Sequence, residues 1–143
     1  MTEKRIEKIK VGSIMTRKVM TIGPNASIVE VQDLFVNHDY NALPVVKNGK
    51  LVGIISKLDL MKVFSSGTEF TISGYFQGLS EKASDIMHAP IVEVGPEDDL
   101  MTVVDYMVEY KLRSIPVTEG NVLVGIISRG DVIKHLIVKK DEE

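Results

Sequence analysis

The chain has 143 residues, of which 44% are apolar and 26% are charged, and its net charge is −3. This composition is typical of a globular protein, and the length excludes a large multidomain enzyme. The negative charge disfavours a broad nucleic-acid-binding face. The absence of cysteine excludes disulfides, thiolate nucleophiles and cysteine–zinc sites.

The sequence contains no signal for membrane insertion. No apolar run approaches the roughly 20 residues that a membrane span needs. The first residues, MTEKRIEKIK, alternate in charge and lack an apolar signal core. We therefore expect a soluble, cytoplasmic protein that does not bind membranes.

The first predicted elements are a short strand and a helix. Residues 19–22 are β-prone and end at a Gly23-Pro24 turn. Ser27 stands three residues before Glu30, which is the spacing of a capping box. Apolar residues then recur at helical spacing, at Ile28, Val31, Leu34 and Phe35.

A hairpin and a second helix follow. The apolar runs 43–46 and 51–55 flank Asn48 and Gly49, and this dipeptide favours a type I′ turn because both residues tolerate positive φ. Residues 56–64 begin with serine and carry apolar residues at helical spacing, which predicts a helix. The order of elements is therefore β-α-β-β-α.

Residues 65–82 form a predicted connecting segment. They contain three glycines and several hydroxyl residues, which favour irregular structure. The segment also holds three aromatic residues, which are Phe70, Tyr75 and Phe76. We expect them to pack on a shared core or on a second subunit, and the alternative is that one stacks on a flat ligand ring.

The second half of the chain repeats the first. A shift of 72 residues lays 13–64 on 85–136 without a gap and gives 17 identities, where about three are expected by chance. In the second copy Asp98 or Asp99 is expected to cap the first helix, and Gly120-Asn121 forms a looser version of the hairpin turn.

The repeat predicts an α+β fold in which two β-α-β-β-α units pack about a pseudo-twofold axis, since each unit alone is too small to bury its apolar face. We place the first unit at 11–64, the connecting segment at 65–82 and the second unit at 83–137.

Each copy contains the pattern Gly-x-x-Ser-x-x-Asp at a predicted helix start. Ser56 with Asp59, and Ser128 with Asp131, have the spacing of an N-cap and a third helical residue. That structural role is one interpretation. The other is that the helix start binds an anion while the carboxylate accepts hydrogen bonds from a ribose diol, and the two roles are compatible.

The full pattern resembles a tandem pair of CBS domains, a family named for cystathionine β-synthase. It consists of Asp/Ser-Ile-Met, an apolar strand, Gly-Pro, a capped helix, apolar-Pro-Val, a hairpin and Gly-Ile-Ile-Ser-x-x-Asp, and it recurs over residues 11–137. The resemblance implies a disc-like module that binds AMP, ADP, ATP or S-adenosylmethionine in two clefts between the units. It also implies homodimers. We expect no required cofactor, and the lack of metal-binding motifs predicts no bound metal.

The resemblance also assigns roles to individual residues. Asp59 and Asp131 match the aspartate that holds the ribose hydroxyls, and Ser56 and Ser128 match the neighbouring hydroxyl residue. We expect each copy's adenine wall to face the other copy's Ser/Asp pair. The first wall comprises Thr16, Val19, Met20, Tyr40 and Asn41, the second comprises His88, Ile91, Val92, Leu112 and Arg113, and the predicted phosphate-binding cations are Lys57, Arg113 and Arg129.

The two copies differ in their predicted sites. The second has Arg113 and Arg129 where the first has Asn41 and Lys57, and arginine binds phosphate bidentately whereas lysine acts as a point charge. We expect two sites of unequal affinity. A monophosphate, or a ligand with its own positive charge, is as compatible with these cations as ATP.

The sequence does not favour an enzyme. It lacks Gly-x-Ser-x-Gly, a Walker loop and metal-binding motifs, and its three histidines are His38, His88 and His135. We expect a stand-alone regulatory module that a partner protein reads. The alternative is a ligand-free oligomerisation module in which Tyr40 and Leu112 block adenine entry. Nucleic-acid binding is disfavoured.

Overall fold

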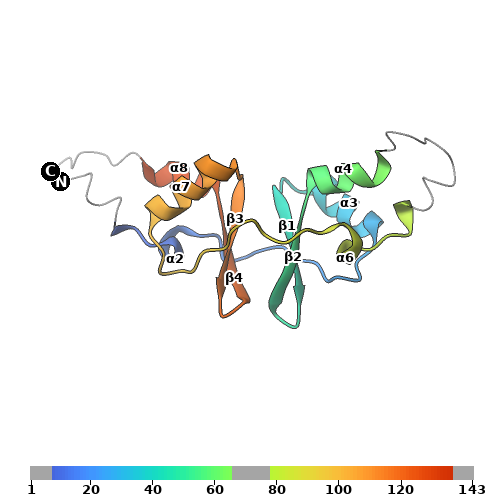
Figure 1. Ribbon diagram of the computed structural model, residues 1–143, viewed down its shortest axis with the longest axis horizontal. Helices are drawn as coiled ribbons and strands as arrows, with labels where there is room; N and C mark the ends of the chain where they lie inside the picture. Colours follow the sequence, from blue (N-terminus) through green and yellow to red (C-terminus); the bar gives the residue numbers. More distant parts are fainter. Residues whose placement is uncertain (1–7, 66–77, 137–143) are drawn as a thin grey trace. The chain divides into compact units, whose positions relative to one another are not determined.

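The structure, a computed structural model, describes residues 8–65 and 78–136 and separates into two compact units (Figure 1). Unit 1 contains the described residues up to Val19 and from Pro90 onward, and unit 2 contains those from Met20 to Ala89. The units therefore exchange short segments relative to the two sequence copies. Phe70, Tyr75 and Phe76 lie outside the described residues, so their packing stays a prediction.

The two units have corresponding elements. Unit 2 contains α3 (Ile28–Asn37), β1 (Ala42–Lys47), β2 (Lys50–Ser56), α4 (Lys57–Phe64) and α6 (Ala83–Ile86). Unit 1 contains α2 (Val11–Ile14), α7 (Leu100–Tyr110), β3 (Ser114–Glu119), β4 (Val122–Ser128) and α8 (Arg129–Leu136). Both strand pairs are antiparallel, and the predicted α+β class is confirmed. Within the described ranges no helix has the length and hydrophobicity to cross a membrane.

The first predicted strand of each copy is reduced to a single bridge. Ile22 pairs with Val45 in parallel, and Val94 pairs with Val117 in the same way. The Ile22 N–H donates to the Pro44 carbonyl at 3.1 Å. The Gly-Pro turn ends the run, because a proline has no N–H to continue a ladder.

The hairpin turns have the backbone geometry that their residues favour. Asn48 and Gly49 have φ values of 55° and 82°, and Gly120 and Asn121 have values of 55° and 72°. Both central positions of a type I′ turn need positive φ. The second turn, expected to be looser, therefore satisfies the same requirement with the two residue types in reverse order.

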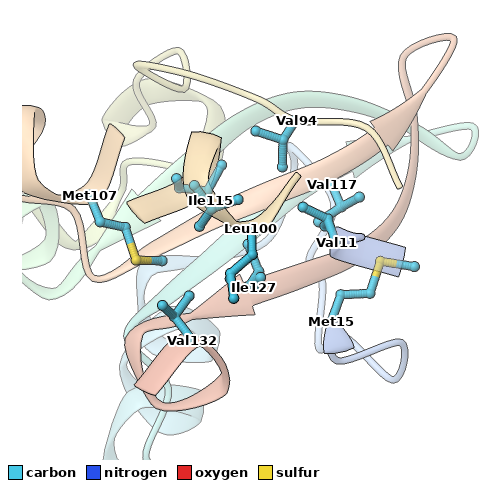
Figure 2. Close-up of a cluster of buried hydrophobic side chains, with 10 residues drawn as sticks. Val11, Met15, Val94, Leu100, Met107, Ile115, Val117, Ile127 and Val132 are labelled. Carbon is cyan, nitrogen blue, oxygen red and sulfur yellow. The ribbon is translucent and has the colours of Figure 1, made fainter. Parts of the chain in front are cut away.

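Each unit has its own buried cluster. In unit 2 it includes Val31, Leu43 and Ile55, all fully buried. In unit 1 it includes Val11 of α2, Leu100 of α7 and Ile127 of β4, whose side chains converge in Figure 2. Burying such a side chain contributes about 1.5–3 kcal/mol. Val11 belongs to the first sequence copy, so this packing holds the N-terminal segment in unit 1.

The helix starts are satisfied in different ways. Ser27 and Glu30 form the predicted capping box of α3. Asp99 is the N-cap residue of α7, but its carboxylate accepts from Lys10 Nζ at 2.9 Å rather than capping the helix. This hydrogen bond raises the pKa of Lys10. The Leu100 N–H of α7 donates instead to the Ile9 carbonyl at 2.8 Å.

A segment of chain crosses one strand in each unit. In unit 2, Ile54 of β2 stands opposite Pro44, and its N–H and C=O bond to the carbonyl and N–H of His88 at 2.9 and 3.0 Å. Such a pair directs its backbone groups away from the hairpin partner, so a proline without an N–H is tolerated there. The segment that leads to His88 therefore lies along the free side of β2.

Unit 1 repeats this crossing. Ile126 of β4 stands opposite Pro116, and it exchanges backbone hydrogen bonds of 2.8 and 2.9 Å with Thr16. The neighbouring Gly125 leaves room for the crossing chain. A Cβ on Gly125 would lie 2.6 Å from Met15 Sδ and 3.0 Å from the Thr16 carbonyl oxygen. The glycine is therefore required by the approach of the backbone.

We expect the substitution Gly125→Ala to lower the free energy of unfolding by about 1–3 kcal/mol, because the Thr16 carbonyl belongs to a bridged backbone and must shift. Urea unfolding followed by circular dichroism measures the effect. Gly23→Ala is the control, since a Cβ there meets nothing within 4 Å and φ is not positive. Equal unfolding free energies for the two variants would contradict the steric role of Gly125.

Candidate functional site

The candidate sites are built on the first turns of α4 and α8. Ser56 is the N-cap of α4, and its Oγ accepts from the Asp59 N–H at 3.2 Å while Asp59 Oδ2 accepts from the Ser56 N–H at 2.8 Å. Ser128 and Asp131 form the same reciprocal pair at 3.2 and 3.0 Å. The capping interpretation of Gly-x-x-Ser-x-x-Asp is therefore confirmed in both copies.

The crossing segments bring a further side chain to each aspartate. His88 Nδ1 lies 2.8 Å from Asp59 Oδ2, and the Thr16 hydroxyl donates to Asp131 Oδ2 at 3.3 Å. Thr16 comes from the first copy and Asp131 from the second, whereas His88 and Asp59 have the reverse origin. The predicted crossed arrangement is confirmed for Thr16 and His88.

Each aspartate uses only one of its carboxylate oxygens in these contacts. Asp59 Oδ2 receives the Ser56 N–H, the Ser56 hydroxyl at 3.0 Å and His88. Asp131 Oδ2 receives the Ser128 N–H and Thr16. Within the described part of the chain, neither Oδ1 has a hydrogen bond. The Asp59 side chain is 13% exposed, so its free oxygen lies in a partly desolvated setting.

The wall residues that directly precede each hairpin do not cross to the other copy. Arg129 Nε donates to the Leu112 carbonyl at 2.7 Å, and its N–H donates to the Arg113 carbonyl at 3.0 Å. Leu112 and Arg113 therefore lie beside their own Ser/Asp pair. Hairpin register is the cause, because Ser114 pairs with Ser128 and holds the preceding residues near the start of α8. The expected crossing of these residues is wrong.

The same register governs Tyr40 and Asn41. Ala42 pairs with Ser56, so Asn41 immediately precedes the residue opposite the N-cap of α4. Tyr40 packs against the buried cluster of unit 2, and its ring stacks on His38 at a centroid distance of 5.0 Å. Both residues thus lie in the unit that contains Asp59.

The structure gives less support to the remaining predicted wall residues. Val92 packs against the buried cluster of unit 1. Val19 is half-buried, whereas Met20 and Ile91 are exposed, and none of these three belongs to either buried cluster. No packing among the described residues fixes them beside Asp59 or Asp131. Their assignment as adenine contacts stays a prediction.

The predicted cations lie near the helix starts. Lys57 is the first residue of α4 and Arg129 the first of α8, and Lys57, Arg113 and Arg129 are all exposed. None of the three forms a salt bridge among the described residues. Arg129 is fixed through its Nε, which leaves its two terminal nitrogens as donors for an anion.

Sequence reasoning missed one contact beside Asp131. His135 Nδ1 lies 3.0 Å from the Asp131 backbone carbonyl, one helical turn earlier. The spacing of four residues on a predicted helix is the signal that finds it. Within the described ranges no cluster of three or more His, Asp or Glu side chains is suited to a metal ion.

An apolar groove of about 340 Å³ lies between α7 and α8. Its lining residues are Val104, Met107, Val108, Lys111, Arg129, Val132, Ile133 and Leu136. It shares only Arg129 with the predicted nucleotide site and includes none of Thr16, Ser128 and Asp131. The groove is therefore a surface distinct from the helix-start site.

Comparison with known proteins gives a family match over most of the chain. The model of the CBS domain matches twice, over residues 11–66 and 83–138. Uncharacterized protein MJ1404 of Methanocaldococcus jannaschii is 33% identical over 140 residues, which cover 93% of this chain and 33% of that protein. The chain spans 33% to 45% of the length of three such curated relatives.

Two similar solved structures contain adenosyl ligands. CBSX2, a CBS-pair protein of Arabidopsis thaliana, was solved in complex with AMP, with a TM-score of 0.74, 25% identity, and coverage of 87% of this chain and 93% of that one. The CBS domain pair of protein MJ0100 was solved with 5′-methylthioadenosine and S-adenosyl-L-methionine, with a TM-score of 0.72, 25% identity, and coverage of 88% and 94%. The chain thus belongs to the CBS domain family and carries two CBS domains.

Proposed function

We propose that this chain is a regulatory module that binds an adenosyl ligand at the starts of α4 and α8 and does not itself catalyse a reaction. The observation that carries the proposal is the Oδ1 of each capping aspartate, which has no hydrogen bond among the described residues and is held in place through Oδ2. A carboxylate oxygen fixed in this way is an acceptor that needs no reorganisation before a ligand hydroxyl binds.

The chemistry around each carboxylate fits a nucleotide. A ribose diol supplies two adjacent hydroxyl donors, and Asp59 or Asp131 supplies the acceptor. A phosphate would find Lys57 in unit 2, and Arg113 and Arg129 in unit 1, near the positive end of a helix. The ligand complexes of CBSX2 and MJ0100 support AMP and S-adenosylmethionine-type compounds as the first candidates.

The alternative, a ligand-free oligomerisation module, requires side chains to fill the adenine sites. Tyr40 and Leu112 were the residues expected to do so. Both pack against the buried cluster of their own unit instead. This packing favours ligand binding over blocked sites.

We expect Asp59→Ala and Asp131→Ala each to abolish one binding event, because each removes the acceptor of one ribose. Isothermal titration calorimetry with AMP, ATP and S-adenosylmethionine measures the number of sites and their affinities. We expect the two sites to differ in affinity, since their cations differ. A ligand at 100 times its Kd should also add about 2.7 kcal/mol to the free energy of unfolding.

The matched controls are Asp33→Ala on α3 and Asp105→Ala on α7. These aspartates are exposed, and they are equivalent to each other in the repeat. Both control variants should bind as the wild type does. Unchanged affinities in Asp59→Ala and Asp131→Ala would exclude the helix starts as binding sites.

We further propose that the chain forms a homodimer through its exposed helix faces. Val108 on α7 and Ile133 on α8 are 73% and 63% exposed beside the apolar groove. Val36 on α3 and Met61 on α4 occupy the equivalent positions in unit 2 and are 71% and 66% exposed. A second copy presents the same apolar faces, so self-association would cover both of them.

We expect the double substitution Val108→Glu and Ile133→Glu to give a monomer, because two buried carboxylates would disfavour the apolar contact. Sedimentation velocity measures the change in mass. Val122→Glu is the control, since Val122 is an exposed apolar residue at the hairpin turn. A monomeric wild type would refute the dimer. The cytoplasmic location and a partner protein stay predictions.

A further inference from the structure

The two aspartate sites are equivalent in geometry but differ in one chemical group. Thr16 and His88 both bridge a strand through paired backbone hydrogen bonds, and both side chains contact Oδ2 of the capping aspartate. A threonine hydroxyl is neutral at every physiological pH, whereas an imidazole gains a proton between about pH 5 and 8. Among the described residues, an imidazole therefore contacts the capping carboxylate of unit 2 and not that of unit 1.

We propose that His88 makes anionic-nucleotide binding in unit 2 respond to pH, through a proton taken up when the nucleotide binds. The inference rests on the proposed function, since it assumes that the start of α4 is a nucleotide site. It goes further in assigning to His88 a role in ligand specificity and regulation, which Thr16 does not have in unit 1.

Contacts at Asp59 set the state of the imidazole. Nδ1 lies 2.8 Å from the carboxylate, so it is the ring nitrogen that carries hydrogen when the ring is neutral. Nε2 is then an acceptor. Protonation turns Nε2 into a second donor and adds one positive charge beside a partly buried carboxylate. The His88 side chain is 44% exposed, so the added charge is accessible to an anionic ligand bound at the start of α4.

Besides Asp59, the charged residues on or beside α4, β2 and α6 are lysines and one aspartate. They are Lys57 and Lys62 of α4, Lys50 of β2, Lys82 beside α6, and Asp85 of α6, which accepts a hydrogen bond from the Lys82 N–H. Lysines ordinarily stay charged, and carboxylates ionised, between pH 5.5 and 8.5. Among the described residues only Asp59 forms an ion pair with His88.

Two other histidines require controls. His38 follows α3 in unit 2 and stacks on Tyr40 at a centroid distance of 5.0 Å, so its imidazole lies beside a residue of the predicted adenine wall. His135 in unit 1 contacts the Asp131 backbone carbonyl at 3.0 Å rather than the carboxylate. Neither ring has a contact with Asp59 among the described residues.

The test compares the protein that retains His88 with the His88→Thr variant. This variant carries at position 88 the residue type that unit 1 has at the equivalent position, Thr16. Both are studied in full-length protein carrying Asp131→Ala, so that calorimetry with AMP reports unit 2 alone. We expect the affinity of the His88 protein for AMP to rise relative to that of His88→Thr between pH 8.5 and 5.5, because a protonated imidazole adds a positive charge beside the bound anion. Because the same nucleotide titrates with both proteins, the ratio of affinities cancels the protonation of the phosphate.

A second readout is the number of protons taken up on binding, obtained at pH 6.5 in buffers of different ionisation enthalpy. We expect the protein that retains His88 to take up more protons on binding AMP than the His88→Thr variant does. The His38→Gln variant also retains His88, so its proton uptake should equal that of the protein with both histidines. Transferring the histidine, with Thr16→His in an Asp59→Ala chain, should make unit 1 pH-dependent. If Asp131→Ala unfolds, the wild type and His88→Thr, each fitted to two sites, give the same comparison.

The outcomes separate this inference from the proposed function. Equal pH profiles and equal proton uptake for His88 and His88→Thr would overturn the role of His88 while leaving the nucleotide site intact. Loss of the pH response in His38→Gln would also overturn it, because the titrating group would then be His38. A protein that binds AMP in neither variant at any pH would overturn both the site and the inference.

Discussion

Both candidate sites depend on one backbone bridge between a strand and a segment from the other sequence copy. Ile54 and Ile126 stand opposite prolines, so their N–H and C=O groups face away from the hairpin and hold His88 and Thr16. Gly125 permits the close approach, since a side chain there would collide with the Thr16 carbonyl. In unit 1, proline on one strand and glycine on the other thus admit the segment that brings Thr16 to Asp131.

A single aspartate in each unit caps a helix and, in the proposed function, also accepts hydrogen bonds from the ligand. Its Oδ2 closes the capping box, which satisfies N–H groups that the first turn of a helix leaves unpaired. Its Oδ1 has no hydrogen bond within the described ranges, and because the carboxylate is planar, fixing Oδ2 also orients Oδ1. A cap that is needed for folding therefore delivers a pre-oriented acceptor, and the structural and functional interpretations of the motif describe the same geometry.

Local features could be predicted from residue patterns, whereas the crossing of segments between the copies was expected from the family resemblance alone. Ser27, Ser56 and the two hairpin turns act over a few residues, so their patterns suffice. The packing of Val11 into the cluster of unit 1 depends on contacts with residues about ninety positions later, which no periodicity encodes. The expected crossing failed for Leu112 and Arg113 because hairpin register outweighs the wall assignment that the family pattern suggested.

Comparison of the two copies separates the features that the backbone determines from the features that a single side chain adds. The bridge bonds at His88 and at Thr16 all lie between 2.8 and 3.0 Å, so the two backbones are equivalent. The side-chain contacts differ, at 2.8 Å for the imidazole and 3.3 Å for the hydroxyl. Because the geometry is shared, a difference in ligand response between the sites must come from the chemistry of the residues around them.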